Sequence, residues 1–436
     1  MRRPTLALLL AAVACGGDDT TAPAIDAGLD APSLPPTADP TRDVVATALT
    51  IDLAAMRGTA VIDLGASTGP GASLEVGDLD IQAVRVDGVD VAFARTGAQL
   101  DLGVGAAPVA STIDYGWRYH DASDGVAAAG YTLTWPYYCG NVFPCRSLPA
   151  DGSRFTLAVT NPPSGQTAVY PASIPTDAAA YQLAWAVGPY VRTSLGRTTA
   201  NTEVVVWHHA GETSAAAAGT KHLRAAFDWM EQHLGPYRFG AEVGSVSAHW
   251  GGGAYGGMEH HPLWHVASDA LGDESVHVHE AAHGWFGDGV RLKCWEDFVL
   301  SEGAATYYEA RVVEEVGDPG AGTAAWAALD RELADLRAAG GGGIAWPQSC
   351  GQVDVLTIFT RVPSVKGALF LRAVERKIGR AMFDATMRQF YDAHAGEAAG
   401  VVDLIDAFRA TSGYDASACA QAWLAQRAVP TALSCP

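Results

Sequence analysis

The sequence has few cations and, beyond its N-terminus, no long hydrophobic run. Its 436 residues include 28 Lys and Arg against 48 Asp and Glu, a formal net charge of −20. Nucleic-acid binding needs clustered positive charge, so this balance excludes nucleic acid as the expected partner. A transmembrane helix needs about 18 or more apolar residues, and no such run follows the N-terminus. Because 49% of the residues are hydrophobic, the sequence predicts a globular protein of two or three domains.

The 7 cysteines include no Cys-x-x-Cys pair, which argues against a cysteine zinc site. One of them, Cys15, lies in the N-terminal segment. The other six form an even set, which in an exported chain predicts disulfides. Several connectivities are possible, and we expect the nearest-neighbour pairs Cys139–Cys145, Cys294–Cys350 and Cys419–Cys435.

Residues 1–15 have the order of a secretory signal peptide. Arg2 and Arg3 precede the apolar run Leu6–Val13, and Cys15 directly follows small residues, as in a bacterial lipobox. Lipidation of Cys15 is our expectation, and ordinary signal cleavage that leaves a free thiol is the alternative. Residues 16–43, rich in Pro, Asp, Ala and Thr, predict a disordered tether. We therefore expect an exported chain, held by a lipid on the periplasmic or surface side of a bacterial envelope.

The region 44–209 has the period-two alternation of β-strands. Leu49 and Ile51 alternate with polar neighbours, and Asp87-Gly88 between two valine-rich runs predicts a hairpin with a primed turn. This pattern predicts an N-terminal antiparallel β-sandwich domain.

From residue 210 the period becomes helical. Leu223, Phe227, Met230 and Leu234 fall on one helix face, and Gly235-Pro236 stops that helix. Further helix-like segments follow, so we expect a mostly helical domain over 210–436. The predicted fold class is α+β, and nothing in the sequence specifies an oligomer.

A short histidine motif carries the chemistry. Seven of the 13 histidines lie between His249 and His283, and the window ends in His279-Glu280-Ala281-Ala282-His283. On a helix, positions i and i+4 share a face, so both imidazoles can bind one Zn²⁺ while Glu280 faces the water to be activated. The motif predicts His279 and His283 as zinc ligands and Glu280 as the general base.

A catalytic zinc site needs a third protein ligand. A histidine six residues past His283 would supply it in one class of metallopeptidase, but that position is Gly289. Glu302 instead follows His283 after 18 intervening residues, near the start of another expected helix. Glu302 is therefore the predicted third ligand, and a solvated carboxylate at a helix start is the alternative.

These motifs together resemble peptidase family M1, the gluzincin aminopeptidases that include aminopeptidase N and leukotriene hydrolase. The zinc segment reads HEAAHGWFGD, eight residues, then DFVLSEGAATYY, and the upstream GGMEH is similar to the family's GAMEN. Further similarities are FPCRSLP, YQLAWAVGPY and VPSVKGALF. The resemblance implies a β-sheet N-terminal domain followed by a thermolysin-like zinc metallopeptidase domain.

The resemblance also implies a substrate-binding segment at Gly256, Gly257, Met258, Glu259 and His260. Glu259 would hold the free α-amino group of a peptide, and the alternative is a surface carboxylate in a Gly-rich loop. The two glycines would let the backbone run beside the peptide as an edge strand. His260 stands where the family has Asn.

Ser364 is the main departure from the family. The family's Tyr that stabilises the tetrahedral oxyanion lies two residues before a Lys-Gly pair, and here Ser364 precedes Lys366-Gly367 in that place. The serine side chain is too short to reach the oxyanion that the family's Tyr contacts. Loss of one oxyanion donor lowers the rate by about 10²–10³. Slow catalysis, a zinc-binding pseudoenzyme and another donor are the open explanations, the candidate donors being Tyr255, Tyr307, Tyr308 and the clustered histidines.

Other polar residues near the motif have simpler interpretations. His260, His261, His265 and His277 are expected to be mostly structural, and His277 lies off the ligand face of its helix. Asp297 is either a carboxylate that orients a zinc-binding histidine or a helix cap.

The sequence thus predicts a zinc-dependent metallopeptidase with one Zn²⁺ and a peptide as its substrate, an aminopeptidase by resemblance. Two alternatives remain: a catalytically impaired relative that binds zinc and peptides, and a hydrolase of a non-peptide substrate.

Overall fold

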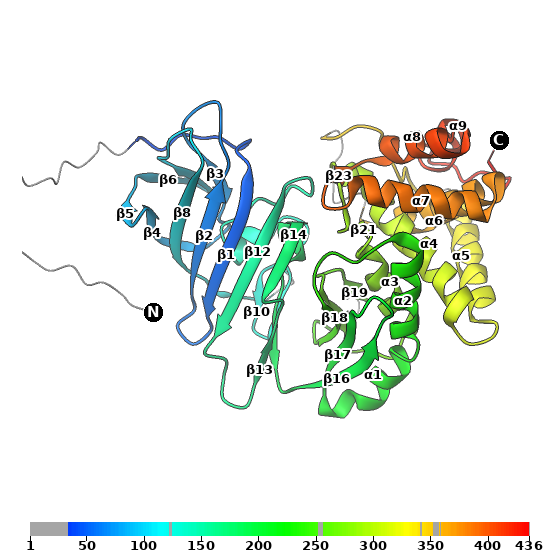
Figure 1. Ribbon diagram of the computed structural model, residues 1–436, viewed down its shortest axis with the longest axis horizontal. Coiled ribbons are helices and arrows are strands. Elements are labelled where there is room, and N and C mark those ends of the chain that lie inside the picture. The colour runs from blue at the N-terminus through cyan, green and yellow to red at the C-terminus, as the bar shows by residue number, and fades with distance from the viewer. Residues whose placement is uncertain are drawn as a thin grey trace, which may run out of the picture. The chain divides into compact units, whose positions relative to one another are not determined.

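The computed structural model describes residues 34–121, 124–251, 256–340, 342–351, 357 and 359–435. The predicted signal peptide, Cys15 and the first part of the predicted tether lie outside the described residues. β-sheets come first along the chain and most helices later (Figure 1), which confirms the expected fold class. Among the described residues, no helix is both long and apolar enough to cross a bilayer.

Three sheets make up the first half of the described chain. Their strand orders are β14-β12-β1-β2-β8-β4-β5, β13-β15-β11-β10-β9 and β3-β7-β6. Pairing is mostly antiparallel as expected, but β1 runs parallel to β12, and β9 runs parallel to β10. The strands are β1 (Val44–Asp52), β2 (Arg57–Leu64), β3 (Ser73–Glu75), β4 (Asp80–Val86), β5 (Val89–Asp90), β6 (Phe93–Thr96), β7 (Gln99–Leu102), β8 (Val109–Gly116), β9 (Tyr119–His120), β10 (Val126–Ala127), β11 (Tyr131–Thr132), β12 (Gly152–Thr160), β13 (Thr167–Val169), β14 (Ser173–Ala179) and β15 (Ala186–Gly188).

The alternation in the sequence matches the two faces of these sheets. In β1, Leu49 and Ile51 are buried while Thr50 is exposed. The predicted hairpin is present between β4 and β5, where Asp87 and Gly88 have φ of 51° and 79°. Two successive positive φ angles define the primed turn that the Asp-Gly pair favours.

The end of the predicted tether is part of the folded sheet region. Residues 34–43 are described, and Arg42 is buried. Its guanidinium donates hydrogen bonds to four backbone carbonyls, those of Gly65, Gly71, Gly105 and Ala107. The expectation of a disordered tether up to residue 43 is therefore wrong for this last stretch, because one arginine satisfies acceptors from two loops.

A five-stranded sheet belongs with the zinc-motif region. The sheet has the order β16-β17-β18-β20-β19, with β18 parallel to both β17 and β20. Its strands are β16 (Tyr190–Arg197), β17 (Glu203–His209), β18 (Glu242–Ala248), β19 (Gly257–Met258) and β20 (Leu263–Ala267). The sheet extends across the boundary expected between residues 209 and 210. Period-two alternation identified β16 and β17 as strands but not the sheet they join.

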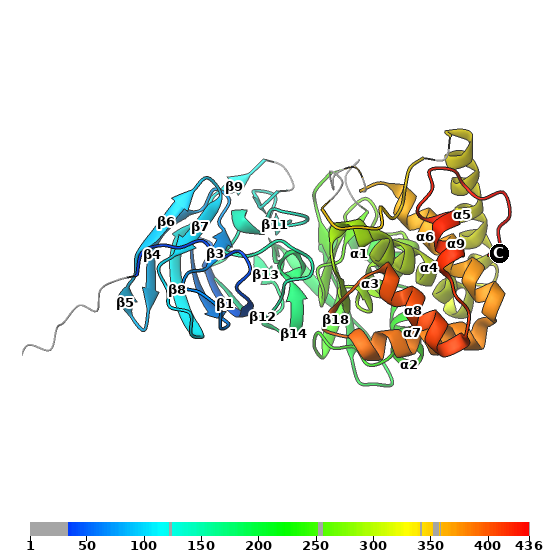
Figure 2. The ribbon, with the colours of Figure 1, turned by 90° about the horizontal axis from the view of Figure 1, so that it is seen from above.

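The helices follow largely as their sequence period predicts. The predicted helix stop is observed, since α2 ends at Leu234 and Gly235 has a φ of 123°. From α4 onward the helices pack around one another (Figure 2). The helices are α1 (Thr213–Gly219), α2 (Leu223–Leu234), α3 (Glu274–His283), α4 (Phe298–Val316), α5 (Ala321–Ala338), α6 (Arg361–Ile378), α7 (Arg380–His394), α8 (Val401–Ser412) and α9 (Ser417–Trp423), and short strands β21 (Phe286–Gly287), β22 (Val290–Leu292) and β23 (Ala398–Ala399) form a small sheet among them.

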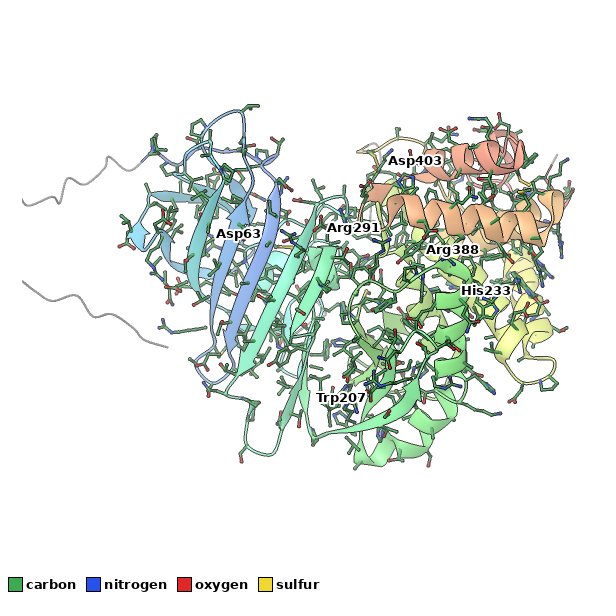
Figure 3. All side chains as sticks on the ribbon, in the orientation of Figure 1. Asp63, Trp207, His233, Arg291, Arg388 and Asp403 are labelled. Carbon is green, nitrogen blue, oxygen red and sulfur yellow. A yellow bond between two sulfur atoms is a disulfide. The ribbon has the colours of Figure 1, made fainter. Side chains whose placement is uncertain are left out.

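Buried polar contacts join the first sheets to the zinc-motif region. Tyr181 donates its hydroxyl to Asp288, five residues after the histidine motif, with an O–O distance of 3.1 Å. Arg291 (labelled in Figure 3) donates to the carbonyls of Asp177 and Gly396, both at 2.8 Å. The sheets therefore help to hold the segment that follows the motif.

Three disulfides are present: Cys139–Cys145, Cys294–Cys350 and Cys419–Cys435. They are the nearest-neighbour pairs. The second links the loop before α4 to a residue 56 positions later in the chain.

Helices α4 and α6 meet at a pair of glycines. A Cβ on Gly303 would lie 2.7 Å from the Cα of Gly367, and a Cβ on Gly367 would lie 2.6 Å from the Cα of Gly303. Backbone approaches this close exclude any side chain at either position. The contact matters for the site because each glycine stands within one turn of a predicted site residue, Glu302 on α4 and Ser364 on α6.

We predict that Gly367→Ala lowers the stability of the chain. Overpacking costs about 1–3 kcal/mol, and the better helix propensity of Ala returns at most about 1 kcal/mol. Chemical denaturation in saturating zinc measures the change. Gly69→Ala is the control, because a Cβ at Gly69 would meet no atom within 4 Å. Equal unfolding midpoints for the two variants would contradict the prediction.

Candidate metal centre and substrate cavity

The histidine motif forms a helix as predicted. Asp273 begins α3 by accepting a hydrogen bond from the backbone N–H of Ser275 at 3.0 Å. His279 and His283 then lie one turn apart, and their Nε2 atoms are 3.2 Å from each other. His283 is almost fully buried and His279 nearly so.

Helix α4 brings Glu302 to the two imidazoles. Its Oε2 lies 3.5 Å from Nε2 of His279, and its Oε1 lies 3.6 Å from Nε2 of His283. A tetrahedral zinc ion with bonds of about 2.0–2.2 Å holds its ligand atoms roughly 3.3–3.6 Å apart. Two imidazole nitrogens and one carboxylate therefore fit one Zn²⁺, with the fourth position left for water. The structure brings together the three predicted ligands.

The two histidines among the predicted ligands are each held by further hydrogen bonds. His279 Nδ1 lies 3.2 Å from Glu309 Oε2. His283 Nδ1 lies 3.1 Å from both the carbonyl of Phe286 and the hydroxyl of Ser301. Such contacts fix the tautomer and ring plane of a ligating histidine.

Glu309 is a site residue that the sequence reasoning missed. It follows Glu302 by seven positions on α4, and residues i and i+7 share a helix face. That spacing was a readable signal. Asp297, the carboxylate considered for this role, makes no hydrogen bond to a histidine of the motif among the described contacts. Its Oδ1 accepts from Trp346 Nε1 and from the backbone N–H of Val401, both at 3.1 Å, so it caps the start of α8 and not that of its own helix, α4.

Ser364 contacts the metal ligand Glu302. Its hydroxyl donates to Glu302 Oε2 at 3.1 Å, and the side chain is buried. The close glycine contact of α4 with α6 makes this distance possible. In the described geometry Ser364 holds the carboxylate of Glu302, the predicted third ligand, which is a different task from the one that the resemblance implies for the family's Tyr.

Glu280 and Glu259 lie beside the ligands in the same buried site. Oxygen atoms of these two carboxylates and a ring nitrogen of His283 all lie within 4.8 Å of one another. A Cβ on Gly257 would lie 2.3 Å from Glu280 Oε1, so only glycine lets the backbone pass so close to this carboxylate. The structure thus brings the predicted base and the predicted amine-binding residue together.

Gly256, Gly257 and Met258 lead into Glu259 at an open sheet edge. Gly257 and Met258 form β19, which pairs antiparallel with β20. Among the described residues β19 is the last strand on its side of the sheet. The backbone groups of β19 that face away from β20 can therefore pair with an added peptide.

His260 is not at the cavity wall formed by the described residues. It is buried, and its ring packs edge-on against that of His265 at 4.7 Å between centroids. Its expected place among the substrate-binding residues is therefore wrong, because the chain turns inward directly after Glu259. His261 and His277 are structural as expected, bonded to the carbonyls of Glu280 and Leu271.

Burial and the two neighbouring histidines shift the pKa values of the three carboxylates in the site. Burial, reinforced by the charge of Glu302, raises the pKa of Glu259 to about 7. Burial also raises the pKa of Glu280 well above its usual value, although the charge of His279 opposes it. For Glu302 burial acts in the same direction, but the hydrogen bond from His279 and the charges of both histidines win and lower its pKa to about 2.

A cavity of about 560 Å³ opens onto these groups. One side is aromatic, with the ring centroids of Trp135 and Phe298 at 4.1 Å and 5.0 Å from that of Phe359. Arg361 and Ser364 line it from the first turn of α6. The carboxylates that line it are Glu259, Glu280, Glu302, Glu309 and Glu332.

Residues 259–423 match the family model described as "Peptidase family M1 domain". Among curated proteins, the chain is similar to leucine aminopeptidase 2 of Neurospora crassa, with 26% identity over 220 residues, 45% of this chain and 32% of that protein. It is also similar to aminopeptidase N of Streptomyces lividans, with 28% identity over 162 residues, 34% of this chain and 18% of that protein. The chain thus spans less than half the length of these curated relatives.

A solved structure covers more of the chain. An M1 zinc metallopeptidase mutant from Deinococcus radiodurans, bound to a Tyr-Ser-Ala substrate, superposes with a TM-score of 0.77 over 91% of this chain and 96% of that chain. At 20% identity this likeness establishes the fold.

We predict that Ser364→Ala weakens zinc binding about tenfold, because residues that hydrogen-bond metal ligands typically contribute 10–100-fold to affinity. Competition with a chromophoric chelator measures the dissociation constant. Ser275→Ala is the matched control, since Ser275 also lines the cavity but its hydroxyl is bonded to Asp273. An unchanged dissociation constant for Ser364→Ala would show that the hydrogen bond to Glu302 does not position the ligand.

Proposed function

We propose that the chain is a zinc-dependent aminopeptidase of peptidase family M1 that removes N-terminal residues from peptides. The observation that carries the proposal is the gathering of five side chains, four of which line one cavity while the fifth, His283, lies buried behind them. His279, His283 and Glu302 can hold the metal, Glu280 stands beside it, and Glu259 adds a second carboxylate at the open end of β19.

Bound zinc would act as a Lewis acid and lower the pKa of water, which is the chemistry that a His₂Glu site supplies. Glu280 is placed to take the proton from the attacking water as the new C–O bond forms. The same carboxyl then gives that proton to the amine nitrogen as the peptide C–N bond breaks. Burial raises the pKa of Glu280, and an ionised carboxylate with a raised pKa is the stronger base toward the proton of water.

Glu259 would make the enzyme an exopeptidase. A buried carboxylate is costly unless a cation pairs with it, and the α-ammonium group of a peptide is such a cation. The peptide backbone would continue along β19 as an added strand, which places the first peptide bond near Glu280. A blocked N-terminus would leave Glu259 unpaired.

The cavity walls favour some first residues over others. The aromatic wall of Trp135, Phe298 and Phe359 supplies apolar surface for a large side chain. The surrounding carboxylates repel an acidic one. We therefore propose a preference for Leu or Phe over Asp or Glu at the first position.

None of the described tyrosines considered as an oxyanion donor lines the cavity. Tyr307 donates its hydroxyl to Glu375 at 3.0 Å, and Tyr308 stacks on Phe286 with its ring buried. Tyr255 lies outside the described residues. Both described tyrosines therefore pack structurally.

Arg361 is the described cavity residue with a permanent positive charge. It stands one turn before Ser364 on α6, so the two side chains share a helix face. Glu332 holds its guanidinium at 3.0 Å, and the side chain is 56% exposed, which leaves N–H groups for a substrate. We propose that Arg361 stabilises the oxyanion in place of the family's Tyr.

The three disulfides support a further proposal, that the chain works in an oxidising compartment outside the cytoplasm.

We expect zinc-dependent turnover of fluorogenic aminoacyl substrates, faster for Leu and Phe than for Asp and Glu. A strong chelator should abolish it. Glu280→Gln should lower kcat by about 10³ or more by removing the base, while zinc content stays the same. Turnover by Glu280→Gln at the wild-type rate would refute the assignment, and no wild-type turnover despite bound zinc would favour the peptide-binding relative.

Arg361→Ala should lower kcat about 10²-fold with little change in KM, the signature of a donor that acts on the transition state. Arg388→Ala is the matched control, because Arg388 forms an exposed ion pair with Asp392 on α7. If Arg361→Ala keeps the wild-type kcat, another group stabilises the oxyanion. Ser364→Tyr tests the family's solution at the position where this chain departs from it.

A further inference from the structure

We infer that His209, Glu212 and His249 form a second metal site, separate in all its ligands from the first. His209 ends β17, Glu212 lies in the short 3₁₀ helix 210–212 that follows, and His249 directly follows β18. Because β17 and β18 are parallel neighbours, their carboxyl ends lie at the same edge of the sheet. The topology therefore brings two histidines and a carboxylate together there.

The three ligand atoms converge on one point. Nδ1 of His209 lies 3.0 Å from Nε2 of His249, and that nitrogen lies 2.7 Å from Oε1 of Glu212. Oε2 of Glu212 lies 3.5 Å from Nδ1 of His209. The corresponding distances among His279, His283 and Glu302 run from 3.2 to 3.6 Å. The second cluster is slightly tighter than the first, so an ion would need only small shifts of the side chains.

Other contacts hold these side chains in place. The ring of Tyr190 stacks on His209 at 4.6 Å between centroids, which fixes the imidazole plane. The backbone N–H of His209 donates to Glu212 Oε2 at 2.8 Å, which leaves Oε1 for the cluster. These contacts preorganise the side chains for an ion.

Hydrogen bonding alone accounts poorly for the arrangement. Nε2 of His249 faces a second ring nitrogen and a carboxylate oxygen, and its single possible proton can point at only one of them. A divalent cation would satisfy all three atoms at once. His120 shows the ordinary case, since it contacts Asp78 and Asp124 through different ring nitrogens and cannot chelate.

Two imidazole nitrogens and a carboxylate favour a transition-metal ion of intermediate hardness. Two imidazoles and one carboxylate suit Zn²⁺ better than Mg²⁺ or Ca²⁺, which prefer oxygen ligands. The His249 side chain is 49% exposed, so an ion can enter from solvent and keep water as a further ligand. A bound ion would tie the ends of β17 and β18 in the sheet whose edge strand, β19, leads to Glu259.

The test is zinc stoichiometry of the full chain without a polyhistidine tag, by equilibrium dialysis and elemental analysis. We expect two zinc ions per wild-type chain, one for His249→Ala and one for His283→Ala, and none for the double variant. His222→Ala is the control and should keep two, because His222 contacts Glu274 at 2.7 Å and Asp318 at 3.8 Å through different ring nitrogens, so the three side chains do not converge on one point.

One zinc ion per wild-type chain, with His249→Ala unchanged, would overturn the inference. That result would leave the proposed catalytic site intact, since His283→Ala would then bind none. If His249→Ala does not fold by circular dichroism, Glu212→Gln replaces it with the same expected loss of one ion. In excess zinc the wild-type melting temperature should also rise more than that of His249→Ala, because only the wild type can bind at the second site.

Discussion

The structure depends on the burial of several acids around two histidines. Glu259 and Glu280 are buried, Glu302 is largely so, and all three lie at one cavity. Each buried ion costs several kcal/mol unless an opposite charge lies close. The imidazole of His283 can supply little of that charge at neutral pH, because burial lowers its pKa to about 4. Burial acts on His279 in the same direction, but its contacts with Glu302 and Glu309 win and raise its pKa, so one imidazole faces three carboxylates. A divalent cation is the partner that balances this set, and the positions of α3, α4 and α6 all serve to place its ligands.

Local patterns predicted the parts of the site that lie close in sequence. His279 and His283 follow from the helical period, and the hairpin at Asp87-Gly88 follows from the turn preference of two residues. Glu302 needed only the assumption that a third ligand lies on the next helix. Glu309 was equally readable, because it follows Glu302 by two helical turns.

Contacts between distant residues could not be read in the same way. Ser364 and Glu302 are 62 positions apart, and their hydrogen bond exists because two glycines let α4 and α6 meet. The sequence left two roles open for Asp297, because its partner Val401 lies 104 positions later. Arg42 was assigned to the disordered tether because composition alone does not show which residues an arginine contacts. Its guanidinium donates to four backbone carbonyls in loops that lie further along the chain. The limit in each case is long-range packing.

Ser364 stands where the family has a tyrosine, and its hydroxyl makes a different contact. A tyrosine there would reach into the cavity, whereas serine turns its hydroxyl to the metal ligand beside it. The cation that faces the same cavity from α6 is then Arg361, one turn earlier. The aminopeptidase proposal and the departure from the family motif are therefore compatible, provided that the metal ligands stay where the helices hold them.

The most direct test of this account is a crystal structure of the zinc-loaded chain with anomalous diffraction recorded at the zinc absorption edge. The account predicts a strong anomalous peak within bonding distance of His279, His283 and Glu302, with the Ser364 hydroxyl still bonded to Glu302. A map without a peak among these three side chains, or with Glu302 turned away from it, would contradict the central claim.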